Sequence, residues 1–374
     1  MTRIYIVRHA EAEGNLYRRV HGRYDSPVTE NGLRQIAALE QRFQDIPVDA
    51  VYSSPLRRPR QTAMAVAGPK HLEIQVEPGL IEMALGDYED MTFGDFTAHH
   101  GEEFRQFVTC SPLFSPPGGE TFAQVAARVK EAFFRIAKEN DGKTVALFSH
   151  GTAIQSLQAA LRGLHPANNR DLGHPENTAV SCYEVEGDRV SILFENDASH
   201  ITDDISTMKR QGKHGRSPLV WFRLPDMDRE SQLYYDARRD AWQDLHGSLA
   251  GFDGEGFLAE ARDQWFLDHR AVQLVMAEDQ TAGLLHLATG RDAAEGVGYI
   301  PFLYLSPAWR GKRVGDQVLG QAIYTYRAMG RQKLRLRCAQ DNLHAQHFYA
   351  RHGFRKTGEA PGSHGTLDIL EKDI

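Results

Sequence analysis

Two kinds of hydrophobic pattern alternate along the first half of the chain. Short runs rich in β-branched and aromatic residues predict strands at residues 3–7, 50–53 and 144–148. Longer stretches have apolar residues on one side at helical spacing, and they predict helices over residues 33–43, 57–67, 121–138 and 153–161. A hairpin over Gly187 and Asp188 joins two further strands at 180–186 and 189–195. Strand, loop and helix repeated in this order are typical of an α/β sheet with covering helices.

The second half has a different order of elements. The polar stretch from Asp203 to Ser217 has little to bury, so we expect a linker or an exposed turn there. After it the patterns predict a strand at 219–224, helices at 232–245 and 256–268, strands at 271–277, 282–289 and 297–305, a helix at 315–329, a strand at 333–339, a helix at 344–352 and two terminal strands. No internal repeat relates the two halves, so we expect two different folds.

Length and charge support a division into two domains. The chain has 374 residues, and its content of 41% hydrophobic and 25% charged residues is typical of a folded globular protein. The net charge of -7 is unevenly distributed, at -9 over residues 1–205 and +2 over residues 206–374. We therefore expect one domain at 1–205, a linker at 206–216 and a second domain at 217–374.

Several classes of protein are excluded at this point. No apolar run is long enough to cross a bilayer, and the charged N-terminal residues do not resemble a signal peptide, so we expect a cytoplasmic protein with no membrane partner. The negative net charge disfavours nucleic acid as a partner. Three separated cysteines, Cys110, Cys182 and Cys338, indicate neither a disulfide framework nor a zinc site. The oligomeric state has no signal in the sequence.

Basic residues follow three of the predicted strands in the acidic half. Arg8 and His9 come directly after the first strand, His150 follows the strand at 144–148, and Arg58 opens the helix after the strand at 50–53. Each residue alone is typical of a polar strand end. If the strands are neighbours, the four side chains converge at one edge of the sheet, where cations and helix N-termini suit a phosphoryl group. A neutral imidazole there can attack phosphorus.

These residues lie in motif blocks that resemble the histidine phosphatase superfamily, with its phosphoglycerate-mutase-like fold. The resemblance covers residues 1 to about 205 and implies a three-layer α/β/α domain. Five blocks carry it in order: Arg8-His9-Ala10-Glu11 with Asn15, Asp25 to Thr29 with Gly32 and Gln35, Tyr52 to Arg58 with Gln61-Thr62-Ala63, Leu80-Ile81-Glu82 with Gly86 and Glu89, and Ser149-His150-Gly151. Ala10 and Asp90 stand where the family usually has glycine.

The resemblance implies a role for each matching residue. His9 is the nucleophile, Glu82 is the proton donor and then the base, and no metal is needed. Arg8, Arg58 and His150 stabilise the phosphoryl oxygens, while Asn15 and Gly151 contribute to substrate binding. A carboxyl that donates a proton at neutral pH needs a raised pKa, which we expect from burial or from the charge of the phosphoryl group.

The choice between phosphatase and mutase depends on weaker features. Gly14 precedes Asn15, where the mutase signature has a tryptophan, so a phosphatase is favoured over a phosphoglycerate-mutase-type isomerase. The segment between Glu82 and His150 is rich in phenylalanine. These rings either cap the pocket or belong to the core.

The second half contains a basic loop, residues 306–315, between a strand and a helix. Backbone amides and cations at such a turn suit a pyrophosphate, although an exposed turn has the same composition. The loop resembles the acetyl-CoA-binding motif of the GNAT acetyltransferase superfamily, and Asn342, Ala345, Phe348-Tyr349 and Gly353-Phe354 match a downstream block of that family. The resemblance covers about residues 216–374 and implies an α/β domain with a mixed, mostly antiparallel sheet.

The GNAT resemblance implies acetyl-CoA as co-substrate and assigns residues to it. The cofactor-binding residues are Leu305, Arg310, Gly311, Lys312, Arg313, Val314, Gly315 and Asn342. Arg313 stands at the first glycine position of the loop, where it either obstructs the turn or adds a cation. Tyr349 is either the general acid for the departing thiolate or a packing residue. No general base is assigned, although Glu295 lies before the central strand.

The leading hypothesis is a bifunctional enzyme, a histidine phosphatase joined to an acetyltransferase, acting on a small phosphomonoester and an amine. Two alternatives stay open. One is a mutase-type isomerase with an acetyl-CoA-sensing module, and the other is a protein whose second domain binds CoA without chemistry.

Overall fold

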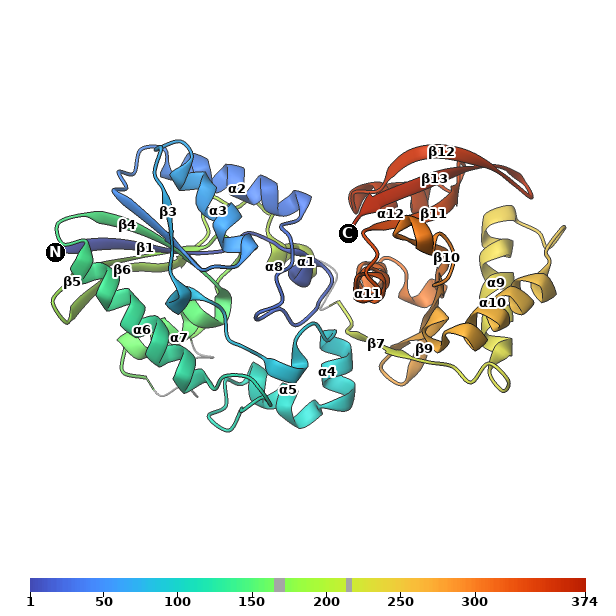
Figure 1. Cartoon of the computed structure of the whole chain (residues 1–374), viewed down its shortest axis with the longest axis horizontal. Coiled ribbons are helices and arrows are strands. Elements are labelled where there is room, and N and C mark those ends of the chain that lie inside the picture. The colour runs from blue at the N-terminus through green and yellow to red at the C-terminus, as the bar shows by residue number, and fades with distance from the viewer. Residues whose placement is uncertain (165–171, 213–216) are drawn as a thin grey trace. The chain divides into compact units, whose positions relative to one another are not determined.

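Two β-sheets, each with its own helices, organise the chain in the computed structural model (Figure 1). The structure describes residues 1–164, 172–212 and 217–374. The chain divides into unit 1, Met1–Arg216, and unit 2, Ser217–Ile374. Both units are α/β and both sheets are mixed, which confirms the predicted fold class. No helix of the described ranges has the length and apolarity to cross a membrane.

The sheet of unit 1 has the strand order β3-β2-β4-β1-β5-β6. The strands are β1 (Thr2–Arg8), β2 (Ala50–Ser53), β3 (Ile74–Val76), β4 (Thr144–Ser149), β5 (Val180–Glu186) and β6 (Arg189–Asp197). The first four strands in this order are parallel, whereas β5 and β6 pair antiparallel. Strands β2, β4 and β1 are therefore neighbours, and their carboxyl ends meet at one edge of the sheet.

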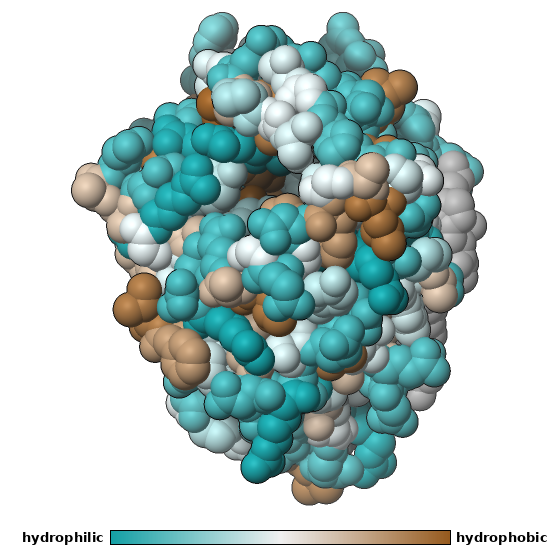
Figure 2. All heavy atoms as spheres, turned by 90° about the vertical axis from the view of Figure 1, so that its right-hand side faces the viewer, coloured by the Kyte–Doolittle hydropathy of each residue, from teal (hydrophilic) through white to brown (hydrophobic). Residues whose placement is uncertain are grey.

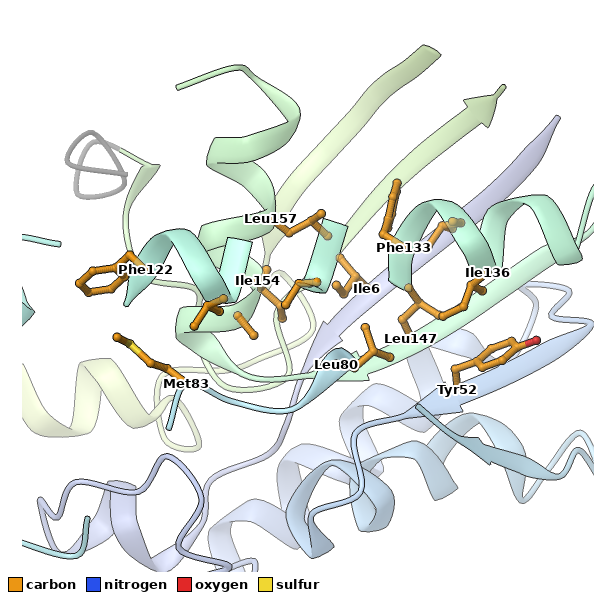
Figure 3. Packing of buried hydrophobic residues seen from close by; sticks show 14 of the residues in the cluster. Ile6, Tyr52, Leu80, Met83, Phe122, Phe133, Ile136, Leu147, Ile154 and Leu157 are labelled. Carbon is orange, nitrogen blue, oxygen red and sulfur yellow. The ribbon is translucent and has the colours of Figure 1, made fainter. Parts of the chain in front are cut away.

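Helices cover both faces of this sheet. The helices of unit 1 are α1 (Glu13–Leu16), α2 (Glu30–Phe43), α3 (Arg57–Ala67), α4 (Phe93–His99), α5 (Gly101–Val108), α6 (Phe122–Glu139), α7 (Gly151–Leu161) and α8 (Thr207–Gly212). Side chains alternate between the faces of β1, so that Ile4 and Ile6 join α6 and α7 in one core while Tyr5 and Val7 join α2 and α3 in another. Figure 3 shows the first core, with Ile6 and Leu147 of the strands against Phe133 and Ile154 of the helices.

The phenylalanines between Glu82 and His150 belong to this core. Phe96 and Phe114 are fully buried, and Phe93, Phe104 and Phe107 pack against the same cluster. Their rings contact one another, as in the edge-on pair of Phe96 and Phe104. Of the two interpretations that the sequence left open, packing in the core is the one that these contacts support.

Residues 207–212 form α8, although the sequence predicts a linker there. Polar side chains attach this helix to unit 1: the Thr207 hydroxyl donates to Glu11 at 2.9 Å, and the Gln211 amide donates to the carbonyl of Asn15 at 3.0 Å. The buried amide of Gln35 also donates to Thr207. Because hydrogen bonds rather than apolar residues dock α8, a search for hydrophobic periodicity does not detect it.

The sheet of unit 2 has the order β12-β13-β11-β10-β9-β8-β7. Its strands are β7 (Val220–Arg223), β8 (Val272–Ala277), β9 (Gln280–Ala288), β10 (Val297–Leu305), β11 (Lys333–Ala339), β12 (Arg355–Gly362) and β13 (Gly365–Asp373). Its helices are α9 (Ser231–His246), α10 (Gly254–Leu267), α11 (Val314–Ala328) and α12 (Leu343–Arg351). Among the strands that the structure describes in unit 2, only β10 and β11 pair in parallel.

Candidate functional site

Three strand ends of unit 1 bring the predicted phosphate-binding residues together. Arg8 is the last residue of β1, His9 follows it, His150 follows β4, and Arg58 lies in the first turn of α3 after β2. The rings of His9 and His150 have centroids 5.1 Å apart. We predicted that these side chains converge if their strands are neighbours. The strands are neighbours in the structure, and the side chains lie together.

His9 is buried and held in one tautomer. Its Nδ1 lies 2.7 Å from the carbonyl oxygen of Ala10, which can only accept, so Nδ1 carries the proton and Nε2 keeps its lone pair. The side-chain amide of Asn177 donates to the carbonyl of His9 at 2.9 Å and fixes the backbone. Burial lowers the pKa of His9 well below its ordinary value, and the charges of Arg58, His150 and Arg8 add to this effect. The imidazole is therefore neutral at neutral pH.

The two arginines are buried beside this ring. Arg58 is completely buried and donates to the carbonyls of His21, Gly22 and Tyr24, each at 2.9 Å, while Arg8 donates to the carbonyl of Pro175. Neither guanidinium forms an ion pair with a carboxylate in the part of the chain that the structure describes. Burial lowers the pKa of Arg58 to about 10 and that of Arg8 in the same direction. Two buried cations without paired carboxylates make a site for an anion.

His150 and Gly151 form the floor of the site at the start of α7. Nε2 of His150 lies 2.8 Å from the hydroxyl of Ser54, and burial lowers the pKa of His150 well below its ordinary value. A Cβ atom added to Gly151 would overlap the ring of His174. Position 151 is therefore restricted to glycine while His174 keeps this position.

Glu82 lies against the N-terminus of α7. Its carboxylate accepts hydrogen bonds from the backbone amides of Met83 at 2.8 Å, and of Thr152 and Ala153 at 3.0 Å. Backbone donors at a helix N-terminus stabilise the ionised carboxylate. The charge of Glu82 also raises the pKa values of Arg8 and Arg58, against the larger effect of their burial. Glu82 is thus an acceptor next to the arginines in the unliganded site.

The sequence prediction missed one histidine in this site. The ring of His21 has its centroid 5.8 Å from that of His9. Nε2 of His21 lies 3.2 Å from the side-chain amide of Asn15, and burial followed by the charge of Arg58 lowers the pKa of His21. Its position in the sequence could have indicated His21, because it shortly precedes the motif block that begins at Asp25. In the described ranges no group of three or more histidine, cysteine or carboxylate side chains is arranged to hold a metal ion.

The candidate site of unit 2 is a cavity where β10 and β11 separate. The strands pair only from Val297–Lys333 to Ile300–Leu336, so the edge of β10 that faces β11 is open from Pro301 onwards. The cavity has a volume of about 550 Å³ and passes through this gap. It is lined by Tyr349 of α12, by Asn342 directly before that helix, and by residues of α9, α10 and the β12–β13 hairpin.

The basic loop predicted to bind pyrophosphate ends at the N-terminus of α11. Gly311 and Arg313 have positive φ angles of 72° and 62°. The guanidinium of Arg313 contacts the buried carboxylate of Asp316 at 2.9 Å, and that of Arg310 pairs with Asp244 at 2.6 Å. Lys312 lies over the ring of Trp309. Two of the three predicted cations are thus bonded to carboxylates of unit 2.

The remaining residues of this loop begin helix α11. Val314 and Gly315 form the first turn of α11, and no side chain caps that turn at Arg313. A Cβ atom on Gly315 would lie 3.2 Å from the ring of Phe348. The open edge of β10 at Leu305 and the uncapped amides of α11 fit the peptide-like arm and the pyrophosphate of acetyl-CoA. Leu305, Gly311, Lys312, Val314 and Gly315 would hold them.

Tyr349 and Asn342 differ in what they can offer to a ligand. Burial raises the pKa of Tyr349, so its phenol is protonated and able to donate in the cavity. Asn342 is the N-cap of α12, and its side-chain oxygen accepts from the amide of Ala345 at 3.1 Å. That oxygen is already used to cap the first turn of α12.

Comparisons with known proteins agree with the geometry of unit 1. A family model described as the histidine phosphatase superfamily (branch 1) matches residues 4–198. The chain is 31% identical over 201 residues to phosphoserine phosphatase 1 of Hydrogenobacter thermophilus, covering 54% of this chain and 95% of that protein. It is 32% identical over 164 residues to a probable phosphoglycerate mutase of Photorhabdus laumondii, covering 44% and 76%. The solved structure of YhfR from Bacillus stearothermophilus matches with a TM-score of 0.53 and 31% identity, covering 54% of this chain and all of that one.

One comparison concerns unit 2. The model of the acetyltransferase (GNAT) family matches residues 232–354, from α9 to the end of α12.

Proposed function

The chain belongs to the histidine phosphatase superfamily and carries a GNAT domain in its second unit, and we propose that unit 1 hydrolyses small phosphomonoesters through a phosphohistidine at His9. The observation that carries this proposal is the state of His9. Its Nδ1 proton is bonded to the carbonyl of Ala10, its Nε2 lone pair is available, and two buried arginines lie nearby.

The hydrolysis takes place in two steps. Nε2 of His9 forms a bond to phosphorus while the bond to the alcohol oxygen breaks, and Arg8, Arg58 and His150 stabilise the phosphoryl oxygens. Glu82 gives its proton to the departing oxygen. Glu82 then takes a proton from water, whose oxygen attacks phosphorus and releases inorganic phosphate from His9. Asn15 and Gly151 border the substrate.

Three backbone amides hold the carboxyl group of Glu82 in the site. We propose that this one group serves as the acid in the first step and as the base in the second.

Hydrolysis and isomerisation can be separated in one experiment. The relatives of unit 1 include proteins named as a phosphoserine phosphatase and as a probable phosphoglycerate mutase, so O-phosphoserine and 3-phosphoglycerate are the first substrates to test. We expect release of inorganic phosphate and no phosphoryl transfer between hydroxyls. His9→Ala is expected to abolish release while unit 1 stays folded. Interconversion of phosphoglycerates without release of phosphate would support the mutase instead.

For unit 2 we propose acetyl transfer from acetyl-CoA to an amine. The cavity between β10 and β11, with the protonated phenol of Tyr349 in its wall, supports this function. The amine nitrogen forms a bond to the acetyl carbon, the carbon–sulfur bond breaks, Tyr349 gives its proton to the thiolate, and the amine proton leaves to water. Calorimetry with acetyl-CoA tests binding, and Tyr349→Phe tests the chemistry. Binding without transfer to any amine would indicate a domain that only senses CoA.

A further inference from the structure

The cavity of unit 2 contains charged side chains that have no ion-pair partners. Arg238 of α9, Arg337 of β11 and Asp341 after β11 all line it. In the part of unit 2 that the structure describes, the acids near α9 are engaged elsewhere. Asp236 pairs with Arg239, Asp244 pairs with Arg310, and Tyr304 donates to Asp240. The two arginines and Asp341 form no ion pair with these groups, although the charge of Asp341 acts on His246, which also lines the cavity.

Arg238 is the most constrained of the three. It is half-buried, and its guanidinium carbon lies 3.9 Å from the ring centroid of Phe302 and 4.6 Å from that of Phe257. Its Nε donates to the hydroxyl of Tyr234 at 2.9 Å. Aromatic faces stabilise the cation and fix its plane, but they leave the outer N–H groups of the fork without acceptors. A guanidinium positioned in this way is ready to bind an anion.

Arg337 lies on β11 in the same wall of the cavity. Side chains on β11 alternate, so that Leu336 and Cys338 are buried while Arg337 is exposed to the opening. Its neighbour Arg335 is paired with Asp292 and Glu371 and belongs to a structural network. Arg337 forms no ion pair with these two acids, although it lines a second, smaller cavity beside them as well.

The cavity also has an apolar wall. Trp242, Phe257 and Phe302 line it together with the charged groups. Figure 2 shows a face of unit 2 where the surface is hollowed and brown atoms are visible inside the hollow. A volume of about 550 Å³ is in the range of cavities that enclose one small molecule.

From these contacts we infer that the cavity of unit 2 recognises a small molecule that carries both an amine and an anionic group, with Arg238 and Arg337 binding the anion and Asp341 facing the amine. The inference rests on the acetyl transfer proposed above, because it makes this molecule the acetyl acceptor. An amine that carries no anionic group would leave the two arginines without a partner inside the cavity. An anionic molecule without an amine would leave Asp341 without an ion-pair partner.

The test compares matched pairs of amines in which only one member carries an anionic group. L-phenylalanine is compared with L-phenylalaninamide, and O-phosphoethanolamine with ethanolamine, so that a carboxylate and a phosphate are distinguished. Binding of each compound is measured by calorimetry without acetyl-CoA, and acetylation is measured separately. In at least one pair, we expect the member that carries the anionic group to bind tenfold or more tightly than the member that lacks it, as for a charge-assisted hydrogen bond.

Three variants link that preference to the cavity. Arg337→Gln is expected to reduce the preference to less than threefold, and Arg238→Lys is expected to weaken it while keeping the charge. Arg239→Gln is the matched control, since Arg239 is the next residue of α9 and pairs with Asp236 at the surface. The inference would be overturned if both members of each pair bind equally well, or if the preference for the anionic group is unchanged in Arg337→Gln. If acetyl-CoA does not bind, acetyl transfer fails, whereas the binding comparison still decides the anion site.

Discussion

The imidazole of His21 occupies the space that a side chain at position 14 would need. A Cβ atom added to Gly14 would overlap Cγ and Nδ1 of this ring. Asn15, the next residue, lies 3.2 Å from Nε2 of the same imidazole, and the ring is edge-on to His9. The small residue at position 14 is therefore what allows His21 to stand beside the nucleophile.

Gly14→Ala is expected to lower kcat/KM for phosphomonoesters by about tenfold, because the added methyl group displaces the ring of His21 at an overpacking cost of about 1–3 kcal/mol. Steady-state kinetics on Gly14→Ala, His21→Ala and the double variant measure this coupling. Once His21 is alanine, the change at position 14 should cause no further loss. Independent, additive losses would show that Gly14 acts through another contact.

The stability of unit 1 is expected to fall as the pH decreases below about 6.5. Burial lowers the pKa values of His9 and His150 in the folded state, whereas both titrate near 6.5 when unfolded. Below that pH the unfolded chain binds protons that the folded chain does not bind. For each such group, the free energy of unfolding then falls by about 1.4 kcal/mol per pH unit. The full contribution of the group to stability is present above about pH 6.5.

Calorimetric unfolding between pH 5 and 8 measures this effect, with the transition of unit 1 identified as the one that inorganic phosphate shifts. His150→Gln is expected to reduce the pH dependence and to leave the part that His9 contributes. His99→Gln, which changes an exposed histidine of α4, should leave the dependence as it is. An undiminished dependence in His150→Gln would assign the effect to other groups.

Glu82→Gln is expected to slow the hydrolysis of alkyl phosphates by about a hundredfold and that of aryl phosphates much less. An alkoxide needs a proton as it leaves, whereas a phenolate does not, and general acid catalysis contributes on this scale. Rates on O-phosphoserine and on p-nitrophenyl phosphate are compared, and inhibition by vanadate checks that the anion site is intact. Equal losses on both substrates would argue against proton donation by Glu82.

The fold was predictable wherever the pattern of apolar residues is strong. The bounds predicted for β2, α3, β5 and β11 agree with the structure, because each of these elements packs an apolar face or run in the core. Strand β3 and helices α1, α4, α5 and α8 were missed. Strand β3 is three residues long and partly exposed, and α8 is docked by hydrogen bonds that leave no periodicity in the sequence.

The site was predictable where strand ends carry its residues. His9 and His150 follow adjacent parallel strands, so their approach to 5.1 Å depends on strand order alone. His21 and Asn177 were not predictable in this way, since both lie in loops whose path is determined by tertiary contacts, such as the bonds from Arg58 to the carbonyls of His21 and Gly22. The partner of Arg313 was likewise absent from the sequence-based alternatives, which considered only obstruction of the loop or binding of phosphate.

Arg313→Gly is expected to leave the affinity for acetyl-CoA unchanged within about threefold, well below the loss that follows removal of a charged phosphate ligand. The guanidinium of Arg313 is bonded to Asp316, a buried carboxylate that also lies 2.9 Å from Nε2 of His352. The side chain of Arg313 therefore stabilises the first turn of α11 and does not point to a ligand role. Calorimetry with acetyl-CoA makes the measurement. Clearly tighter binding would mean that arginine obstructs the loop, and clearly weaker binding would mean that it is a ligand.

The same position also predicts a difference in stability between two substitutions. Arg313 has a φ angle of 62°, a left-handed conformation that costs a residue with a Cβ atom about 1–2 kcal/mol and costs glycine almost nothing. Both Arg313→Gly and Arg313→Ala lose the ion pair with Asp316, but only alanine keeps the strain. Urea unfolding should therefore find Arg313→Gly more stable than Arg313→Ala by about 1 kcal/mol, the reverse of their order in an ordinary helix, where alanine is favoured by a similar amount. If alanine proves equal or better, position 313 is not held in the left-handed conformation, and the loop that precedes α11 has another shape.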